Sequence, residues 1–345
     1  MDQSKPIGFA VVGCGLIGQR RAMAVPPGTL LYACDLDLSR AEQVGRQHQG
    51  CTPTDSVEQV LESKEVTAVI VSTVNSALAP ITLAAVQSGK DVLVEKPAAI
   101  RLADLEEIEK AANLSGNRVR IGYNHRYHPS FLKARELIVK DRLGEPFMVR
   151  GRYGHGGRRG YEREWRADPK LSGGGELIDQ GVHLIDLAGS FLGEWTQIDG
   201  HATTYYWDMP VDDNTFLSLR TANGSTAWLH VSCSEWKNLF CFEVYFRRAK
   251  LQIDGLGGSY GVERLSYYRM LPEMGPPETT IFEFPRGDQS WAYEVSEFVT
   301  DIKQRRLPRP GITEAKSVLR VVETIYHTSG LTNPGSEPGC REKQK

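Results

Sequence analysis

The chain has 345 residues, which at about 150 residues per domain is enough for two domains. Its composition, with 40% hydrophobic and 24% charged residues, is that of a globular protein and excludes a collagen, a coiled coil or a wholly disordered chain. The formal net charge of -2 provides no overall positive field, which argues against nucleic acid or an anionic membrane as a partner. The expected partners are small molecules and other protein chains.

The apolar stretches and the cysteines are typical of a cytoplasmic protein. Residues 1–6 are polar and the apolar run behind them ends at Gly13, which is too short for the core of a signal peptide. The stretch 66–86 contains Asn75 and Pro80 and therefore indicates a strand followed by a helix, not a membrane span. The six cysteines show no CxxC spacing, and a chain of this length needs no disulfide framework. We therefore expect a soluble cytoplasmic protein without a membrane partner.

Residues 7–123 alternate apolar runs of strand length with helical patterns. Strands are expected at 7–13, 30–35, 68–73, 91–95 and 118–123, and helices are expected from Leu16 and at 38–48, 76–88 and 102–115. Continuous apolar strands with crossover helices are typical of a parallel sheet that is covered on both faces. The pattern predicts a doubly wound α/β domain over residues 1–123.

From residue 124 the strands alternate apolar and polar residues. After a helix near 130–141, strands are expected at 147–153, 197–207, 215–221, 225–233, 240–246, 250–254, 264–270 and 279–284. This alternation predicts an open, mostly antiparallel sheet with one covered face, and hence an α+β domain over residues 124–330. Helices are expected near 290–304 and 313–329, the second of them packing on the first domain, and a disordered tail is expected at 331–345.

The segment Gly13-Cys14-Gly15-Leu16-Ile17-Gly18 lies where the first predicted strand turns into the first helix, as a dinucleotide-binding turn does. Gly13 permits the turn, Gly15 lets the backbone approach a pyrophosphate, and Gly18 allows close packing of helix on strand. Asp35 ends the second strand, where a carboxylate can accept the ribose hydroxyls and repel a 2′-phosphate. These residues predict NAD, with NADP disfavoured. A glycine-rich turn that binds nothing is the alternative.

The motif Glu95-Lys96-Pro97 follows an apolar strand and lies at the carboxyl edge of the predicted parallel sheet, where ligands of such folds bind. The Lys96 ammonium can hydrogen-bond a substrate oxygen and offset negative charge as a hydroxyl becomes a carbonyl. An ordinary surface lysine is the alternative, because the motif is short.

A glycine-rich turn at 173–175 leads into a predicted helix that carries Asp179, His183 and Asp186. Residues at i and i+4 share a helix face, so a carboxylate lies beside an imidazole whose ordinary pKa of about 6.5 suits general-base chemistry. Two other interpretations stay open. The segment can be a helix with a satisfied histidine and two solvated acids, or the three side chains can form a metal site.

Arginines and aromatic residues are interleaved before this turn. Six arginines, which suit phosphate or carboxylate groups, occur at Arg150, Arg152, Arg158, Arg159, Arg163 and Arg166. They indicate either an anionic substrate or a solvated loop or subunit contact. Residues 124–128 follow the last parallel strand and are candidates for the cleft. Four tryptophans are expected to pack the second sheet: Trp207, Trp228, Trp236 and Trp291.

The chain resembles the Gfo/Idh/MocA family of oxidoreductases in a set of motifs that occur in the same order. These are GCGLIG at 13–18, Asp35, EKP at 95–97, the pair Asn124 and Arg126, and GGGELIDQGVH at 173–183. The resemblance covers about residues 7–330. It implies an N-terminal Rossmann domain, a C-terminal open-faced sheet that forms the substrate wall and an oligomer interface, and a homodimer or homotetramer. Members act on a carbon of a sugar, a cyclitol or a nucleotide-linked sugar.

The resemblance implies Lys96, Asp179 and His183 as the catalytic set. Residues expected to bind NAD are Gly13, Gly15, Leu16, Ile17, Gly18, Asp35, Thr73, Asn75, Glu95 and Lys96. Residues expected to bind substrate are Lys96, Asn124, Arg126, Arg166, Asp179 and His183, and no metal is expected. Relatives often carry T-P-N-x-x-H after the strand that ends near Thr73, whereas this chain has Val74 and Leu78 at the proline and histidine positions. The cofactor loop therefore departs from the pattern of the family.

These expectations predict reversible hydride transfer between nicotinamide and a secondary-alcohol carbon of a polyhydroxylated substrate. His183 would take the hydroxyl proton, Lys96 would stabilise the oxygen, and Asp179 would hold the imidazole or a neighbouring hydroxyl. Three other functions stay open: an NAD-dependent glycoside hydrolase or lyase with no net redox change, a metal-dependent lyase or isomerase, and a non-catalytic protein that senses NAD or a sugar.

Overall fold

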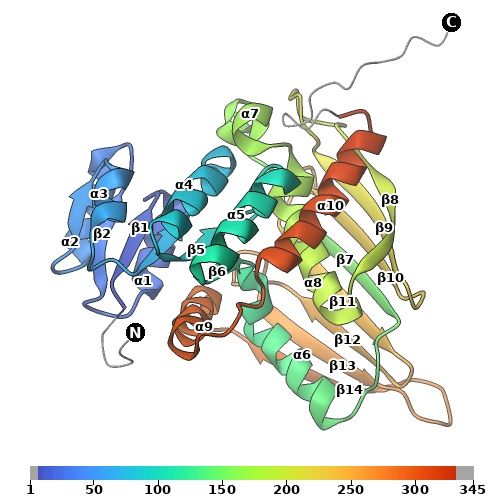
Figure 1. Cartoon of the computed structure of the whole chain (residues 1–345). Helices are drawn as coiled ribbons and strands as arrows, with labels where there is room; N and C mark the ends of the chain where they lie inside the picture. The colour runs from blue at the N-terminus through green and yellow to red at the C-terminus, as the bar shows by residue number, and fades with distance from the viewer. Residues whose placement is uncertain (1–6, 332–345) are drawn as a thin grey trace, which may run out of the picture.

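The computed structural model describes residues 7–331, and its first sheet lies in the N-terminal part of the chain (Figure 1). Six strands form this sheet: β1 (Phe9–Val12), β2 (Leu30–Cys34), β3 (Thr52–Thr54), β4 (Ala68–Val71), β5 (Asp91–Glu95) and β6 (Val119–Gly122). Their spatial order is β3-β2-β1-β4-β5-β6, and all neighbours are parallel. Strands β1, β4 and β5 are buried along their whole length, as expected for a sheet covered on both faces. The predicted doubly wound fold is confirmed.

Helices connect these strands: α1 (Leu16–Ala24), α2 (Leu38–Gln47), α3 (Val57–Glu62), α4 (Asn75–Gln87) and α5 (Leu102–Ser115). The sequence pattern missed β3 and α3. Strand β3 has three residues, of which Thr52 and Pro53 are exposed, so it lacks the apolar run that marks a buried strand.

The second sheet has eight strands in the order β14-β13-β12-β11-β7-β10-β9-β8. They are β7 (Met148–Gly154), β8 (Trp195–Thr203), β9 (Asn214–Thr221), β10 (Thr226–Ser232), β11 (Leu239–Phe246), β12 (Ala249–Asp254), β13 (Glu263–Arg269) and β14 (Glu278–Phe284). All neighbours are antiparallel except the central pair of β7 and β10, which is parallel. The expected mostly antiparallel sheet is therefore confirmed.

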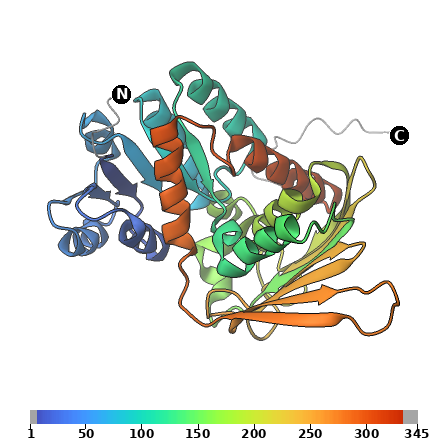
Figure 2. The same cartoon turned by 90° about the horizontal axis from the view of Figure 1, so that it is seen from below.

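One face of the second sheet is covered by helices and the other is open (Figure 2). The helices on the covered face are α6 (Pro129–Lys140), α8 (Val182–Leu192) and α10 (Ile312–Thr328). On β10, Ala227 and Leu229 are buried, whereas the side chain of Trp228 between them is 65% exposed on the open face. Trp236 is 79% exposed. The expectation that both tryptophans pack the sheet is wrong. Alternation along β10 turns Trp228 outward, and Trp236 lies in the loop between β10 and β11.

The two C-terminal helices contact both halves of the structure. Helix α9 (Ser290–Gln304) packs against α1, and α10 packs against α5, α8 and β8. Arg120 of β6 donates Nε to Asp301 of α9 at 2.8 Å, and both side chains are fully buried. Of the tail expected at 331–345, residues 332–345 lie outside the described residues. Within residues 7–331 no helix has the length and apolarity needed to span a bilayer.

Candidate active site

The three glycines of the first turn have different surroundings. Gly13 has φ +91, and a Cβ there would lie 2.5 Å from the Ser72 carbonyl oxygen. A Cβ on Gly18 would lie 1.8 Å from the Gly13 carbonyl oxygen. A Cβ on Gly15 would meet nothing within 4 Å, and its φ of -67 is open to any residue. Packing within the protein thus requires Gly13 and Gly18 but not Gly15, which fits a backbone position that a pyrophosphate approaches.

Asp35 lies beside this turn. Its Oδ2 accepts the Cys14 N–H at 2.7 Å and its Oδ1 accepts the Asp37 N–H at 2.9 Å. No lysine or arginine of residues 7–331 forms an ion pair with it, so its negative charge is balanced only by backbone dipoles. The turn and this carboxylate together provide the donor set and the charge that NAD requires.

Lys96 reaches from the end of β5 to the second domain. Its Nζ lies 2.6 Å from Asp179 Oδ1 and 2.6 Å from the Asp179 carbonyl oxygen. Arg166 donates Nε to Asp179 Oδ2 at 3.0 Å. We call Lys96, Asp179 and Arg166 the cavity charge cluster. Burial acts to raise the pKa of Asp179, but the charges and hydrogen bonds of Lys96 and Arg166 outweigh burial and hold this pKa below its usual value.

Asp179 lies in a π-helical turn, Leu177–Gly181, that precedes α8. The predicted continuous helix is therefore wrong at this point, because π turns leave the same apolar spacing as α turns over so short a run. Asp212 anchors the start of the turn, since its two oxygens accept the N–H groups of Gly175 at 2.9 Å and Leu177 at 2.8 Å. Such turns often occur at functional sites.

The His183 imidazole is stacked on that of His125, with ring centroids 3.8 Å apart and planes at 19°. Burial and the nearby Lys96 charge lower the pKa of His183 well below its usual value, so the ring is neutral at pH 7. Its Nδ1 is buried without a partner among residues 7–331, which contradicts the satisfied-histidine interpretation. Asp179 does not orient this ring, because its oxygens are bound to Lys96 and Arg166.

A cavity of about 600 Å³ joins these groups. Of the predicted site residues, those that line it are Ile17, Glu95, Lys96, Asn124, Arg166, Asp179 and His183. Its walls come from both domains, so the catalytic set named from the sequence is brought together from distant segments.

Three predicted site residues, Thr73, Asn75 and Arg126, lie neither in the dinucleotide turn nor in the lining of the cavity. Arg126 binds both oxygens of Asp186 at 2.7 Å, and Asn75 donates to the Ser172 carbonyl at 2.8 Å. Neither these residues nor Thr73 line the cavity. Both carboxylates of the suggested metal site are therefore held by cations, and no group of three His, Cys, Asp or Glu within residues 7–331 is arranged to hold a metal ion.

Glu95 lines the cavity, but its carboxylate faces Arg21. Arg21 Nε lies 2.6 Å from Glu95 Oε1, and Arg21 Nη1 lies 2.6 Å from Glu294 Oε2. We call Arg21, Glu95 and Glu294 the buried charge cluster. It connects α1, β5 and α9 behind the cavity wall.

The six arginines of the sequence pattern do not form one site. Arg150 pairs with Glu243 at 2.5 Å and Arg158 pairs with Glu164 at 2.6 Å. Arg166 is the member of the six that lines the cavity. Arginines that lie close together in the sequence therefore do not necessarily face the same site.

Sequence reasoning missed other cavity residues, including Arg20, Tyr260 and Asp288. Trp291 also lines the cavity, which corrects the expectation that it packs the second sheet. Arg20 follows Ile17 at i+3 on the helix that opens at the dinucleotide turn, a spacing that could have placed it on the same side. Nothing local signals Trp291, because its position depends on how α9 returns to α1.

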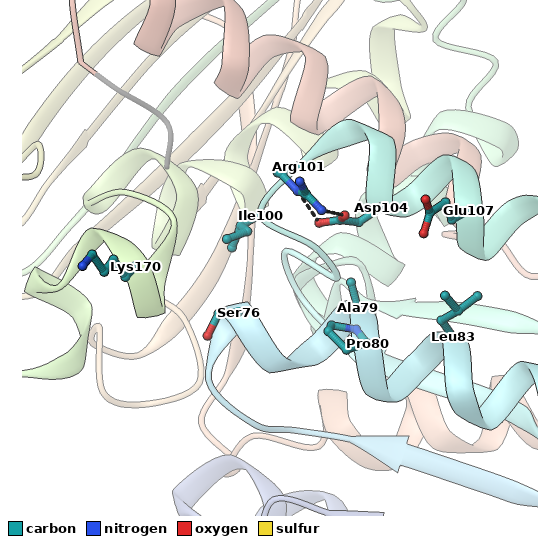
Figure 3. A pocket seen from close by; sticks show the side chains of 9 residues that line it. All are labelled: Ser76, Ala79, Pro80, Leu83, Ile100, Arg101, Asp104, Glu107 and Lys170. Carbon is teal, nitrogen blue, oxygen red and sulfur yellow. Dashed lines mark hydrogen bonds and ion pairs between the residues drawn. The ribbon is translucent and has the colours of Figure 1, made fainter. Parts of the chain in front are cut away.

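A second hollow of about 830 Å³ lies between α4 and α5 (Figure 3). Ala79, Pro80 and Leu83 of α4 form one side of it, and on the other side Arg101 binds Asp104. None of the predicted site residues lines this hollow.

Comparison with protein families finds two matches. Residues 7–123 match a model described as oxidoreductase family, NAD-binding Rossmann fold, and residues 131–252 match the GFO/IDH/MocA C-terminal domain. Scyllo-inositol 2-dehydrogenase (NAD(+)) of Bacillus subtilis (strain 168) is 28% identical over 200 residues, or 56% of each chain. The chain thus spans little more than half the length of that relative. Inositol 2-dehydrogenase 4 of Saccharopolyspora erythraea is 26% identical over 265 residues, covering 74% of this chain and 75% of that protein.

Among solved structures, levoglucosan dehydrogenase in complex with NADH superposes with a TM-score of 0.83, at 17% identity, over 94% of this chain and 97% of that one. At this identity the likeness establishes the shared fold.

Proposed function

The chain belongs to the Gfo/Idh/MocA family of oxidoreductases, and on this premise we propose that it is an NAD-dependent dehydrogenase or reductase. It transfers a hydride between nicotinamide and a secondary-alcohol carbon of a sugar or cyclitol. One observation carries the proposal: Lys96 and His183, distant in the chain, line one cavity with Ile17 of the dinucleotide turn. The relatives named as inositol 2-dehydrogenases support a polyhydroxylated ring as substrate.

The roles of the residues follow from their charge states. NAD supplies the hydride acceptor when it is bound. His183 is neutral and its Nδ1 is buried, which leaves Nε2 to accept the hydroxyl proton while Nδ1 keeps its own. The cavity charge cluster contains two cations and one carboxylate, so Lys96 can donate to the substrate oxygen and stabilise its negative charge. Arg166 keeps Asp179 ionised and in place.

The test is a screen of purified protein and NAD against free sugars, inositols, glycosides and nucleotide-linked sugars, with NADH absorbance and substrate consumption measured in parallel. We expect NADH to accumulate with at least one polyol, and expect His183→Ala to lower kcat by a factor of about 100 to 1000. Substrate loss without NADH would instead identify a hydrolase or lyase. Loss of activity in chelator would identify a metal enzyme, and cofactor binding without turnover would identify a sensor.

We also propose that the open face of the second sheet contacts a second copy of this chain. Trp228 and Arg150, on the adjacent strands β10 and β7, point outward from this face and are 65% and, for the Arg150 side chain, 56% exposed. An exposed tryptophan at the centre of a sheet is typical of a surface that is covered by another chain. Light scattering of the wild type and of Trp228→Lys tests this. We expect the variant to have the lower molar mass, and equal masses would contradict the interface.

A further inference from the structure

The cavity continues past the catalytic residues along helix α1. Its lining includes Ile17, Arg20, Met23 and Ala24, whose spacing places them on one face of the helix. The distance from Ile17 to Ala24 along a helix is about 10 Å. The cofactor is expected at the first turn of α1, so this outer part of the cavity, which we call the α1 trough, begins about one turn beyond it.

The opposite wall of the trough holds an aromatic ring in a fixed orientation. Trp291 Nε1 donates to Asp288 Oδ2 at 2.9 Å, and the Arg21 guanidinium carbon lies 4.5 Å from the ring centroid. Arg21 is itself fully buried and bound to Glu95. These two contacts restrain the ring, so the stacking of another ring on it would cost little further rotamer freedom.

The same trough carries an exposed arginine, Arg20. Among residues 7–331 its guanidinium has no hydrogen bond or ion pair; it lies 6.0 Å from the Trp291 ring centroid. Of the carboxylates that line the cavity nearby, Glu95 is ion-paired with Arg21, and Asp288 accepts hydrogen bonds from the uncharged side chains of Ser290 and Trp291. The guanidinium N–H groups of Arg20 are therefore available for charge-assisted hydrogen bonds to an anion from outside the protein.

We propose that the α1 trough is a subsite for a nucleoside diphosphate that is attached to the reacting sugar. The diphosphate binds Arg20, the base stacks on Trp291, and the sugar reaches Lys96 and His183 at the inner end. A free monosaccharide would leave the ring and the charge of the trough unused. The proposal rests on the hydride-transfer function proposed above and narrows its substrate to a nucleotide-linked sugar.

The binding test uses calorimetry with saturating NADH, so that the cofactor site is filled, and takes UDP, dTDP and glucose 1-phosphate as probes. We expect at least one nucleoside diphosphate to bind, and expect Arg20→Ala to raise its Kd by about tenfold. Trp291→Leu should raise it to a similar extent of about tenfold, and Trp291→Phe, which keeps a ring, should restore most of the affinity. Unchanged NADH affinity in each variant shows that the fold is retained.

Matched controls are Arg46→Ala and Trp236→Leu, which remove an exposed arginine and an exposed tryptophan that do not line the cavity. Both should bind UDP and dTDP like the wild type. No binding of either diphosphate would overturn the proposal. So would glucose 1-phosphate binding as tightly as both nucleotides with no effect of Trp291→Leu, because the trough would then recognise phosphate without a base.

Kinetics separate this proposal from the hydride-transfer function. We expect a nucleotide-linked sugar to have a higher kcat/KM than the free sugar, and expect Arg20→Ala to raise KM for the former by about tenfold with little change in kcat. If a free cyclitol is oxidised and neither diphosphate binds, the subsite fails and the function stands. If a diphosphate binds as described and no compound yields NADH, the function fails and the subsite stands.

Discussion

Glu95 and Lys96 are neighbours in the chain, yet they belong to two clusters with opposite excess charge. The buried charge cluster has one cation, Arg21, and two carboxylates, and the side chains of Arg21 and Glu294 are 0% exposed. The cavity charge cluster has two cations and one carboxylate, and the side chains of Lys96 and Arg166 are 17% and 33% exposed.

The difference shows that the sign of the excess charge and its access to water decide whether a charge cluster can act on a substrate or only stabilise the fold. Burial raises the pKa of Glu294 to about 7 despite Arg21, so this cluster approaches neutrality by protonation. In the cavity the excess is positive and the pKa of Asp179 is lowered, so the carboxylate stays ionised. A positive excess that faces a cavity can stabilise a substrate oxygen, whereas a sealed cluster can only hold α1, β5 and α9 together.

The largest effect is expected from Arg21→Met, which removes the one cation of the buried charge cluster. Two buried carboxylates are then left without a partner, and the free energy of unfolding should fall by about 3 to 5 kcal/mol. Urea denaturation measures it. Arg20→Met, the adjacent but exposed arginine, is the control and should stay within about 0.5 kcal/mol of the wild type. Equal losses in the two variants would contradict a structural role for the buried cluster.

The second prediction concerns Lys96→Met in the cavity charge cluster. Turnover should fall by a factor of about 100 to 1000, because the substrate oxygen loses its stabilising cation. The free energy of unfolding should change much less than in Arg21→Met, since Asp179 keeps Arg166. Steady-state kinetics and urea denaturation of the same preparation measure both. Lys133→Met, which removes a lysine paired with Glu136 on α6, should leave turnover unchanged. If Lys96→Met lost as much stability as Arg21→Met, the two clusters would not differ in their structural roles.

The third prediction is that the free energy of unfolding depends on pH through Glu294 of the buried charge cluster. The pKa of Glu294 rises from 4.5 to about 7 on folding, so the folded state binds the proton more tightly. Its contribution to stability is therefore complete below pH 4.5 and is lost as pH rises to about 7, with a slope of at most about 1.4 kcal/mol per pH unit. Glu294→Gln should flatten this part of the stability curve. Parallel curves for the variant and the wild type would show that Glu294 does not titrate there.

The smallest effect is expected at Asp35, a carboxylate that is balanced by backbone N–H groups and not by a cation. Asp35→Ala should weaken NAD binding by about tenfold. The affinity for NADP should come closer to the affinity for NAD, because the carboxylate no longer repels the 2′-phosphate of NADP. Fluorescence titration with NADH and NADPH measures both affinities. An unchanged preference would remove Asp35 from the account of cofactor choice.

Several features could be predicted from the sequence because they depend on neighbours along the chain. Gly13 and Gly18 act through one turn and one helix start, where Gly13 has a positive φ and Gly18 has no room for a Cβ. The alternation in strands such as β10 and β11 reports which residues face the helices. Lys96 and His183 were named from motifs, and their roles in catalysis stay a prediction that the kinetic tests address.

Other assignments failed because side chains choose partners from distant segments. Asn124 and Arg126 lie in the same short turn, yet Asn124 lines the cavity while Arg126 turns to Asp186. Asp179 was expected beside His183 and instead binds Lys96 and Arg166, with His125 stacked on the imidazole. Helical spacing limits which residues can share a face, but it does not say what lies opposite that face.

The sequence by itself determined the two sheets, the dinucleotide turn and the types of residue available for proton transfer, because each of these depends on local spacing and on alternation of apolar residues. Tertiary structure alone decided which charges meet. The return of α9 onto α1 places Trp291 beside Arg20 and Glu294 beside Arg21, and the meeting of β5 with the π turn gives Lys96 its carboxylate. Charge interactions act across a few ångströms of space regardless of separation along the chain, so only the folded arrangement assigns their partners.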